Sequence, residues 1–145
     1  MNRLEFKVEI NAPKEKIWKV LWNDDTYTEW TGVFCEGSYT QSDWTEGGKI
    51  LFLSPSGEGM YSTILKKTPN QFMSFRHDGM VKEGKELPLD EETRKWSGAE
   101  ENYTLKEKDG SVELLVEMDI AEQYQDYFKE AFPKGLQKVK ELSEN

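Results

Sequence analysis

The chain has 145 residues, 36% of them hydrophobic and 12% aromatic, which favours one folded domain spanning residues 1–145 and excludes a disordered chain. A formal charge of −9, with no dense cluster of Lys and Arg, argues against nucleic acid and anionic membrane as partners. One cysteine excludes an internal disulfide, and the absence of a leader-like or membrane-spanning apolar segment leads us to expect a cytoplasmic protein.

The first 32 residues predict a strand followed by two short helices. Apolar and charged residues alternate over residues 4–10, as in a half-buried strand. Asn11 is expected to cap the helix that follows, and Pro13 suits its first turn, where a missing N–H is tolerated. A second short helical segment is expected over residues 24–30, closed by Gly32.

From residue 33 to residue 120 the pattern predicts an antiparallel meander. We expect strands, most of them bounded by Gly, Pro or Asn, over residues 33–39, 49–53, 60–67, 72–78, 101–106 and 112–120. The last two are joined across Lys108, Asp109 and Gly110, a favourable hairpin turn. In the final strand apolar residues alternate mainly with acidic ones, so one face meets a core and the other meets water.

Two segments depart from this meander. Residues 80–95 carry nine charged residues with Gly84 and Pro88, and we expect an exposed loop, either a lid over a binding site or a tolerated insertion. Residues 124–142 place apolar residues at intervals of three and four, which predicts a long amphipathic helix. Pro133 predicts a kink or break in that helix near residues 130–132.

This order of elements predicts an α+β fold. A curved antiparallel sheet would wrap around the long C-terminal helix, because no other element is long enough to cover its buried face. The two short helices would close one end. Such a sheet leaves space around a single helix, and the abundance of large aromatic residues predicts an apolar cavity there.

Several segments resemble motifs of the SRPBCC (START-like, Bet v-like) superfamily, specifically its branch related to the activator of heat shock protein 90 ATPase. The segments are, in order, Ile10-Asn11-Ala12-Pro13, Ile17-Trp18, Trp30, Gly47-Gly48-Lys49, Trp96-Ser97-Gly98-Ala99, residues 101–105 and residues 132–142. Two features depart from the family: Phe132 stands where its closing helix usually has Trp, and residues 80–95 are unusually acidic. The resemblance implies a helix-grip fold, which in this superfamily hosts lipid carriers, hormone receptors, cyclases and cochaperones.

Conventional catalytic chemistry has little support in the sequence. His77 is the only histidine and therefore the only natural general base near neutral pH; the alternative is a strand-end histidine near solvent. Asp78 points to the opposite strand face and cannot orient it. Cys35 has no neighbouring cation and is expected to be a buried or half-buried small residue. We find no metal-ligand spacing, phosphate loop or nucleophile motif, and therefore predict no catalytic set, metal or cofactor.

Aromatic residues are the strongest functional signal. Each one alone is consistent with an ordinary core, but together they could enclose a planar or apolar ligand. The candidates for the cavity wall are Trp30, Met73, Phe75, His77, Trp96, Tyr103, Tyr124 and Phe128.

Three functions follow, in order of support. The first is a non-enzymatic protein, a monomer or weak dimer, that binds a small apolar molecule in an internal cavity. The second is a cochaperone-type interaction module with a chaperone partner, which rests on the resemblance alone. The third is a cyclase or hydrolase-type enzyme that uses His77 with a cavity acid.

Overall fold

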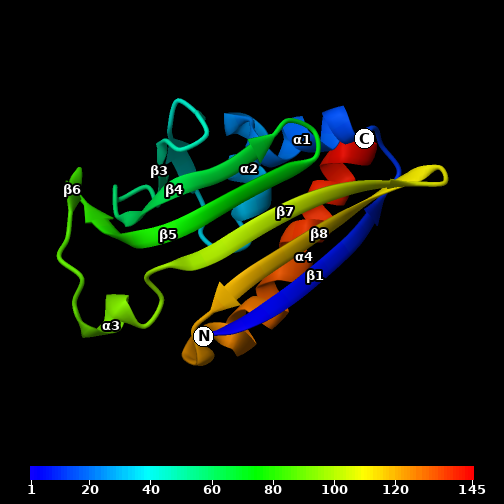
Figure 1. Ribbon diagram of the computed structural model, residues 1–145. Coiled ribbons are helices and arrows are strands. Elements are labelled where there is room, and N and C mark those ends of the chain that lie inside the picture. The colour runs from blue at the N-terminus through cyan, green and yellow to red at the C-terminus, as the bar shows by residue number, and fades with distance from the viewer.

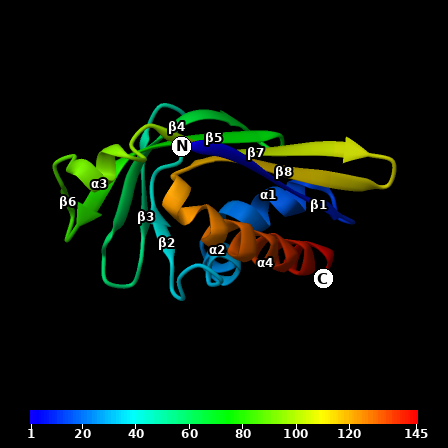
Figure 2. The same cartoon turned by 90° about the horizontal axis from the view of Figure 1, so that it is seen from below.

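The computed structural model describes residues 1–145 and contains an eight-stranded antiparallel sheet with helices on one side (Figures 1 and 2). The strand order is β1-β8-β7-β5-β4-β3-β2, with β6 paired to β5. The strands are β1 (Asn2–Ile10), β2 (Tyr39–Gln41), β3 (Lys49–Leu53), β4 (Gly59–Thr68), β5 (Phe72–Lys82), β6 (Lys85–Glu86), β7 (Ala99–Lys108) and β8 (Ser111–Ile120). The helices are α1 (Lys14–Trp22), α2 (Asp24–Thr31), α3 (Glu91–Arg94), the 3-10 turn η1 (Glu122–Tyr124) and α4 (Gln125–Glu144).

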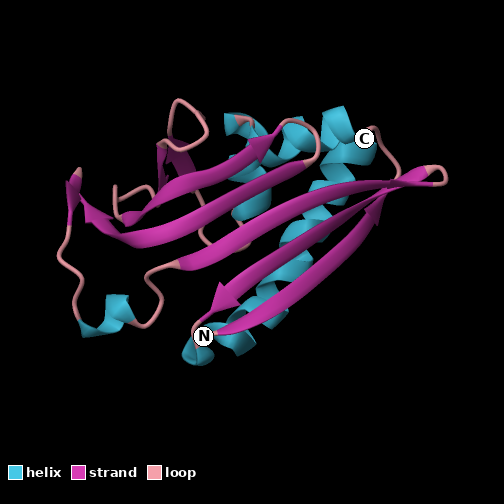
Figure 3. Cartoon of the chain, in the orientation of Figure 1, coloured by secondary structure: helices cyan, strands magenta, loops and turns pink.

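The long helix α4 lies against the same face of the sheet as α1 and α2, as Figure 2 shows in the view from below. Figure 3 shows it crossing behind β8 and β1, the pair that ends the sheet on that side. This is the curved sheet around a long C-terminal helix that the order of elements predicted, and it is the helix-grip fold that the resemblance implied. None of the helices is both long and apolar enough to cross a membrane.

Strand alternation determines which side chains form the core. In β8 every second residue from Val112 to Ile120 is buried, as the pattern predicted. Phe6 on the neighbouring β1 stacks on Phe132 of α4, with ring centroids 4.9 Å apart. Full burial of one such side chain contributes about 1.5–3 kcal/mol, so the apolar stripe of α4 is sufficient to attach it to the sheet.

Two strand predictions were wrong. Residues 33–38 form turns and not a strand, because Phe34 N–H donates to Thr31 O and the positive φ of Gly37 turns the chain. β5 continues past the predicted end at residue 78. Gly79 permits a close approach within the sheet, since a Cβ there would lie 2.6 Å from the Tyr61 hydroxyl oxygen.

Residues 80–95 are more ordered than the predicted exposed loop. Their first part completes β5, and β6 pairs with it. The short helix α3 follows, capped by Asp90, whose side chain accepts the backbone N–H of Thr93 at 2.8 Å. The segment before Trp96 is therefore held in place by β6 and α3.

Three local expectations also need correction. α4 runs through Pro133 without a break, since the loss of one backbone hydrogen bond is offset by the buried residues on either side. Asn11 does not cap α1; its backbone N–H donates to Glu144 at the end of α4. Cys35 is exposed, because it lies in the turns that follow α2.

Candidate functional site

A cavity of about 430 Å³ lies between the inner face of the sheet, α2 and the N-terminal half of α4. This volume falls in the range of small-molecule sites. The most exposed lining residues are Tyr124 and Tyr127, at 43% and 49%, so the mouth of the cavity is at the start of α4.

The wall of the cavity is mainly aromatic. Seventeen of the 22 lining residues are hydrophobic. At the deep end Trp22 packs edge-to-face on Tyr103, with centroids 4.8 Å apart. Trp30 is fixed there because its indole N–H donates to the Leu21 carbonyl oxygen at 3.1 Å. The aromatic lining residues are Trp22, Tyr27, Trp30, Phe34, Phe52, Trp96, Tyr103, Tyr124, Tyr127, Phe128 and Phe132.

Six of the eight residues proposed from the sequence border this cavity: Trp30, His77, Trp96, Tyr103, Tyr124 and Phe128. Met73 and Phe75 do not border it, although they share the inner face of β5 with His77. Phe75 is fully buried against Trp22 and Phe52, at centroid distances of 5.3 and 5.2 Å. Met73 and Phe75 therefore belong to the packed core, and Trp22 and Phe52 form the wall in their place.

The cavity has five polar lining residues and no lysine or arginine. Two of the five are already paired: Thr31 donates to the Tyr27 carbonyl oxygen and Ser38 to the Cys35 carbonyl oxygen, each at 2.6 Å. The other three are Asp119, His77 and Glu101. The character of the polar end depends on where these three side chains lie.

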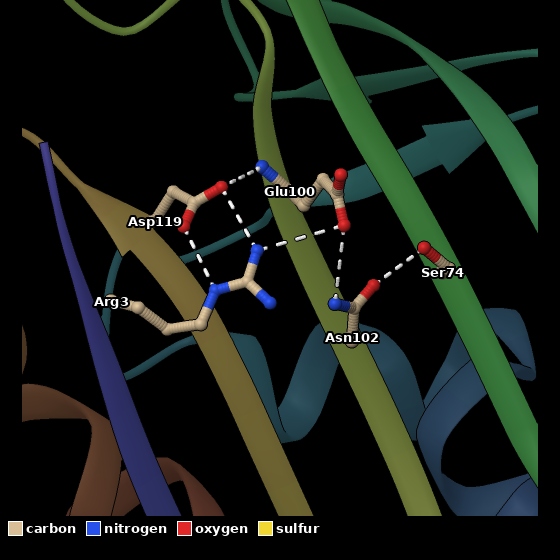
Figure 4. A network of polar contacts seen from close by, with 5 residues as sticks. All are labelled: Arg3, Ser74, Glu100, Asn102 and Asp119. Carbon is tan, nitrogen blue, oxygen red and sulfur yellow. Dashed lines mark hydrogen bonds and ion pairs between the residues drawn. The ribbon is translucent and has the colours of Figure 1, made fainter.

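The Asp119 carboxylate is bound on the opposite face of the sheet. Figure 4 shows it paired with Arg3 of β1, within a chain of polar contacts that continues through Glu100 and Asn102 of β7 to Ser74 of β5. The guanidinium donates to both carboxylate oxygens, at 2.9 and 3.1 Å, and the Glu100 backbone N–H donates at 3.0 Å. Arg3 holds the pKa of Asp119 below its usual value, mainly through this hydrogen bond. The charge of Asp119 is therefore neutralised away from the cavity.

The remaining polar group is a cluster around His77. Its Nδ1 lies 2.8 Å from Ser62 Oγ on β4, and its Nε2 lies 2.9 Å from Glu101 Oε1 on β7. The other oxygen of Glu101 accepts the Tyr103 hydroxyl. Because a carboxylate can only accept, Nε2–H donates to Glu101, and in the neutral ring Nδ1 accepts the Ser62 hydroxyl proton.

The tyrosines near this carboxylate stay protonated. Burial raises the pKa of Tyr103 far above its ordinary value, and the negative charge of Glu101 and the hydrogen bond to it raise it further. Burial also raises the pKa of Tyr27, again with a contribution from the charge of Glu101. Both hydroxyls are therefore hydrogen-bond donors over the physiological range.

This cluster does not form a hydrolytic triad. Ser62 is 1% exposed and does not line the cavity, so its hydroxyl cannot reach a bound molecule. Both nitrogens of His77 already have protein partners, and no group of three or more potential metal ligands occurs. The arrangement positions a carboxylate at the wall of an apolar cavity, which suits recognition of a polar group.

Glu101 and Ser62 were not among the residues predicted from the sequence. The expectation that Asp78 does not orient His77 was correct, since Asp78 binds Arg76 and Thr63. The alternative of a strand-end histidine near solvent was wrong, because His77 lies within β5 and is buried. Alternation along β7 places Glu101 on the same face as Tyr103, and this acidic residue on an inner face was the available signal.

Comparison with known proteins places this geometry in context. Residues 11–144 match the family model described as Activator of Hsp90 ATPase homolog 1-like protein. No curated protein matches the sequence.

Solved structures share the fold. The Aha1 dimer from Colwellia psychrerythraea superposes with a TM-score of 0.75 at 19% identity, over 99% of this chain and 97% of that one. Protein MLL2253 from Mesorhizobium loti gives 0.75 at 16% identity, over 97% and 96%. DynU16, a protein of the dynemicin biosynthetic locus, gives 0.71 at 12% identity, over 97% of this chain and 46% of that one. At these identities the likeness shows the fold alone.

Proposed function

The chain belongs to the Activator of Hsp90 ATPase homolog 1-like family, and we propose that it binds a small hydrophobic molecule in the cavity beside α4. One observation carries the proposal: a space of about 430 Å³, walled by aromatic residues, remains between the sheet and the helices. Cores of folded proteins are close-packed, and an apolar pocket of this size that opens at the start of α4 has the dimensions of a small-molecule site.

The wall is suited to affinity for an apolar ligand. Its aromatic side chains are already held by packing, as Trp22 is on Tyr103. These side chains therefore lose little conformational entropy when a ligand binds. The buried indole N–H of Trp22, another lining residue, has no acceptor in the chain. Buried donors are rarely left unpaired, and such a donor supports a site that is completed by another molecule.

An enzyme that uses His77 has less support. Its ring is held between Ser62 and Glu101, and neither partner leaves a ring nitrogen free. A general base needs a nitrogen within reach of the substrate proton. DynU16 belongs to a biosynthetic locus, which associates this fold with small-molecule chemistry without assigning a reaction to this chain.

A thermal-shift screen with neutral, cationic and anionic aromatic compounds tests binding. A compound present at 100 times its dissociation constant stabilises the folded protein by about 2.7 kcal/mol. For a domain of this size we expect a rise in Tm of about 5 to 10 °C.

The control variant is Ala99→Phe, because Ala99 lies on the inner face of β7 and lines the cavity. The added ring fills the space without removing any wall residue. We expect the hits of the unmodified protein to vanish in this variant. A panel that produces no shift in the unmodified protein, or equal shifts in both proteins, would contradict the proposal.

A second candidate is a chaperone-interaction module, favoured by the family assignment and by the likeness to the Aha1 dimer. It predicts that the purified protein increases the ATPase rate of an Hsp90-type chaperone. Ala99→Phe should leave that stimulation intact, because the residue is buried in the cavity wall. No stimulation at micromolar concentration would remove this candidate.

A further inference from the structure

The charge along the cavity wall has a single sign. Glu101 is the one carboxylate that faces the cavity, because Asp119 pairs with Arg3 on the other face of the sheet. No lysine or arginine lines the wall. A ligand group that enters the polar end therefore meets a carboxylate with no lysine or arginine beside it.

Glu101 retains capacity to accept hydrogen bonds. Each of its oxygens receives one protein donor, His77 at Oε1 and Tyr103 at Oε2. A carboxylate offers about four acceptor positions, so about two remain for other donors. Its two protein partners also hold the group in a fixed orientation, which favours binding of a ligand donor over reorganisation of the wall.

Tyr27 provides an independent observation at the same end. The residue is 8% exposed and lines the cavity, yet its hydroxyl has no hydrogen-bond partner in the chain. Tyr27 packs edge-to-face on Trp30, and Trp30 packs in the same way on Tyr103, whose hydroxyl donates to Glu101. A ligand hydroxyl could donate to Glu101 and accept from Tyr27, and a ligand ammonium could donate to both oxygens.

We infer that the ligand carries a hydrogen-bond donor, an alcohol or an amine, at one end of an apolar body, and that the cavity rejects carboxylates and other anions. The inference rests on the proposed function and specifies its ligand class. Burying an anion without a counter-cation is strongly unfavourable, and Glu101 adds repulsion. The faces of Trp and Tyr rings favour cations further.

The test is isothermal titration of four compounds with one ring system: 2-naphthylmethylamine, 2-naphthalenemethanol, 2-methylnaphthalene and 2-naphthoate. We expect the amine and the alcohol to bind at least about tenfold more tightly than methylnaphthalene, a difference of about 1.4 kcal/mol. Naphthoate should bind more weakly than methylnaphthalene. Naphthoate binding as tightly as the amine would overturn the inference alone. A lack of binding by all four compounds would overturn the proposed function and this inference with it.

Variants assign the preference to the named groups. Glu101→Gln should reduce affinity for the amine at least about tenfold and weaken the discrimination against naphthoate, because the repulsion by the carboxylate is lost. Glu5→Gln, an exposed acid on the outer face of β1, is the matched control and should change neither affinity. Tyr27→Phe removes no internal hydrogen bond, and should fold normally while weakening the alcohol more than methylnaphthalene. Unchanged selectivity in both Glu101→Gln and Tyr27→Phe would overturn the assignment.

Discussion

His77 on β5 and Glu101 on the adjacent β7 are joined side chain to side chain, with Nε2 of the ring 2.9 Å from Oε1 of the carboxylate. Nδ1 of the same ring lies 2.8 Å from Ser62 Oγ on β4. Side-chain hydrogen bonds therefore link the neighbouring strands β4, β5 and β7 beside the cavity. This connection fixes the one carboxylate that faces an otherwise apolar wall. Stability and the proposed ligand recognition therefore depend on the same few atoms.

Replacing His77 should destabilise the fold more than replacing its serine partner. His77→Ala leaves both Ser62 and Glu101 without this partner, and unpaired buried polar groups cost about 1–3 kcal/mol each. Ser62→Ala removes the bond to Nδ1 alone and should cost about 1 kcal/mol. Urea unfolding followed by circular dichroism measures both. An unfolding free energy for His77→Ala equal to that of the unmodified protein would show that the cluster contributes no stability.

Stability should decline at alkaline pH because of the buried tyrosines. Burial raises the pKa of Tyr27 and Tyr103 in the folded state above the value of about 10 in the unfolded chain. Below about pH 10 the two protonated tyrosines make their full contribution to the free energy of unfolding. Above this pH the contribution falls by about 1.4 kcal/mol per pH unit for each tyrosine. Tyr27→Phe should make the unfolding free energy fall less steeply between pH 10 and pH 11 (about one tyrosine's share).

The control for that experiment is Tyr124→Phe, which removes an exposed hydroxyl at the mouth of the cavity. Urea unfolding at closely spaced pH values gives the slopes. A slope for Tyr27→Phe that matches those of Tyr124→Phe and the unmodified protein would contradict the burial of the Tyr27 hydroxyl.

The pair formed by Arg3 and Asp119 should contribute modestly and only above acidic pH. Because Arg3 lowers the pKa of Asp119, this contribution is present above about pH 4 and is lost as the pH falls through the folded-state pKa. Both side chains are partly exposed and screened by water, so Arg3→Gln should reduce stability by at most about 1 kcal/mol at pH 7. The difference from the unmodified protein should shrink at pH 3.

Lys66→Gln removes an exposed cation of β4 and serves as the control. Denaturation at pH 7 and pH 3 provides the comparison. A loss for Arg3→Gln that is the same at both pH values would show that it arises from packing of the side chain and not from the charge pair.

Trp96 should matter for binding more than for folding. It is half-buried after α3 and forms part of the cavity wall. Trp96→Ala should weaken binding of an aromatic ligand by about tenfold, in the manner of an aromatic residue at a binding hot spot. Trp18→Ala changes another half-buried tryptophan that does not line the cavity. Calorimetric titration should show no change in affinity for Trp18→Ala; an equal loss in both variants would contradict the assigned wall.

Much of the fold could be predicted because alternation and helical spacing are local signals. The stripe on α4 and the two-residue period of β8 each identify an element and its buried face. The prediction failed where a residue's role depends on a distant neighbour. A glycine such as Gly79 often marks the end of a strand in a sequence. Here it lies inside β5, because the absence of a side chain makes room for the Tyr61 ring.

The site could be predicted only in part for the same reason. Strand alternation and helical spacing identify the positions on the inner face, and most of the aromatic candidates therefore border the cavity. Which strands flank β5 is a property of the sheet order, so the contacts of His77 with Ser62 and Glu101 could not be seen. Phe75 shares the face of His77 but lies where Trp22 and Phe52 cover it.

The central claim is that a ligand occupies the aromatic cavity, and the five tryptophans allow it to be tested directly. Trp22, Trp30 and Trp96 line the cavity, whereas Trp18 and Trp44 do not. In a ¹H–¹⁵N correlation spectrum titrated with 2-naphthalenemethanol, the indole signals of the first three should shift and saturate together, and those of the other two should move least. Saturable binding that shifts Trp18 and Trp44 and leaves the three lining signals in place would contradict the account.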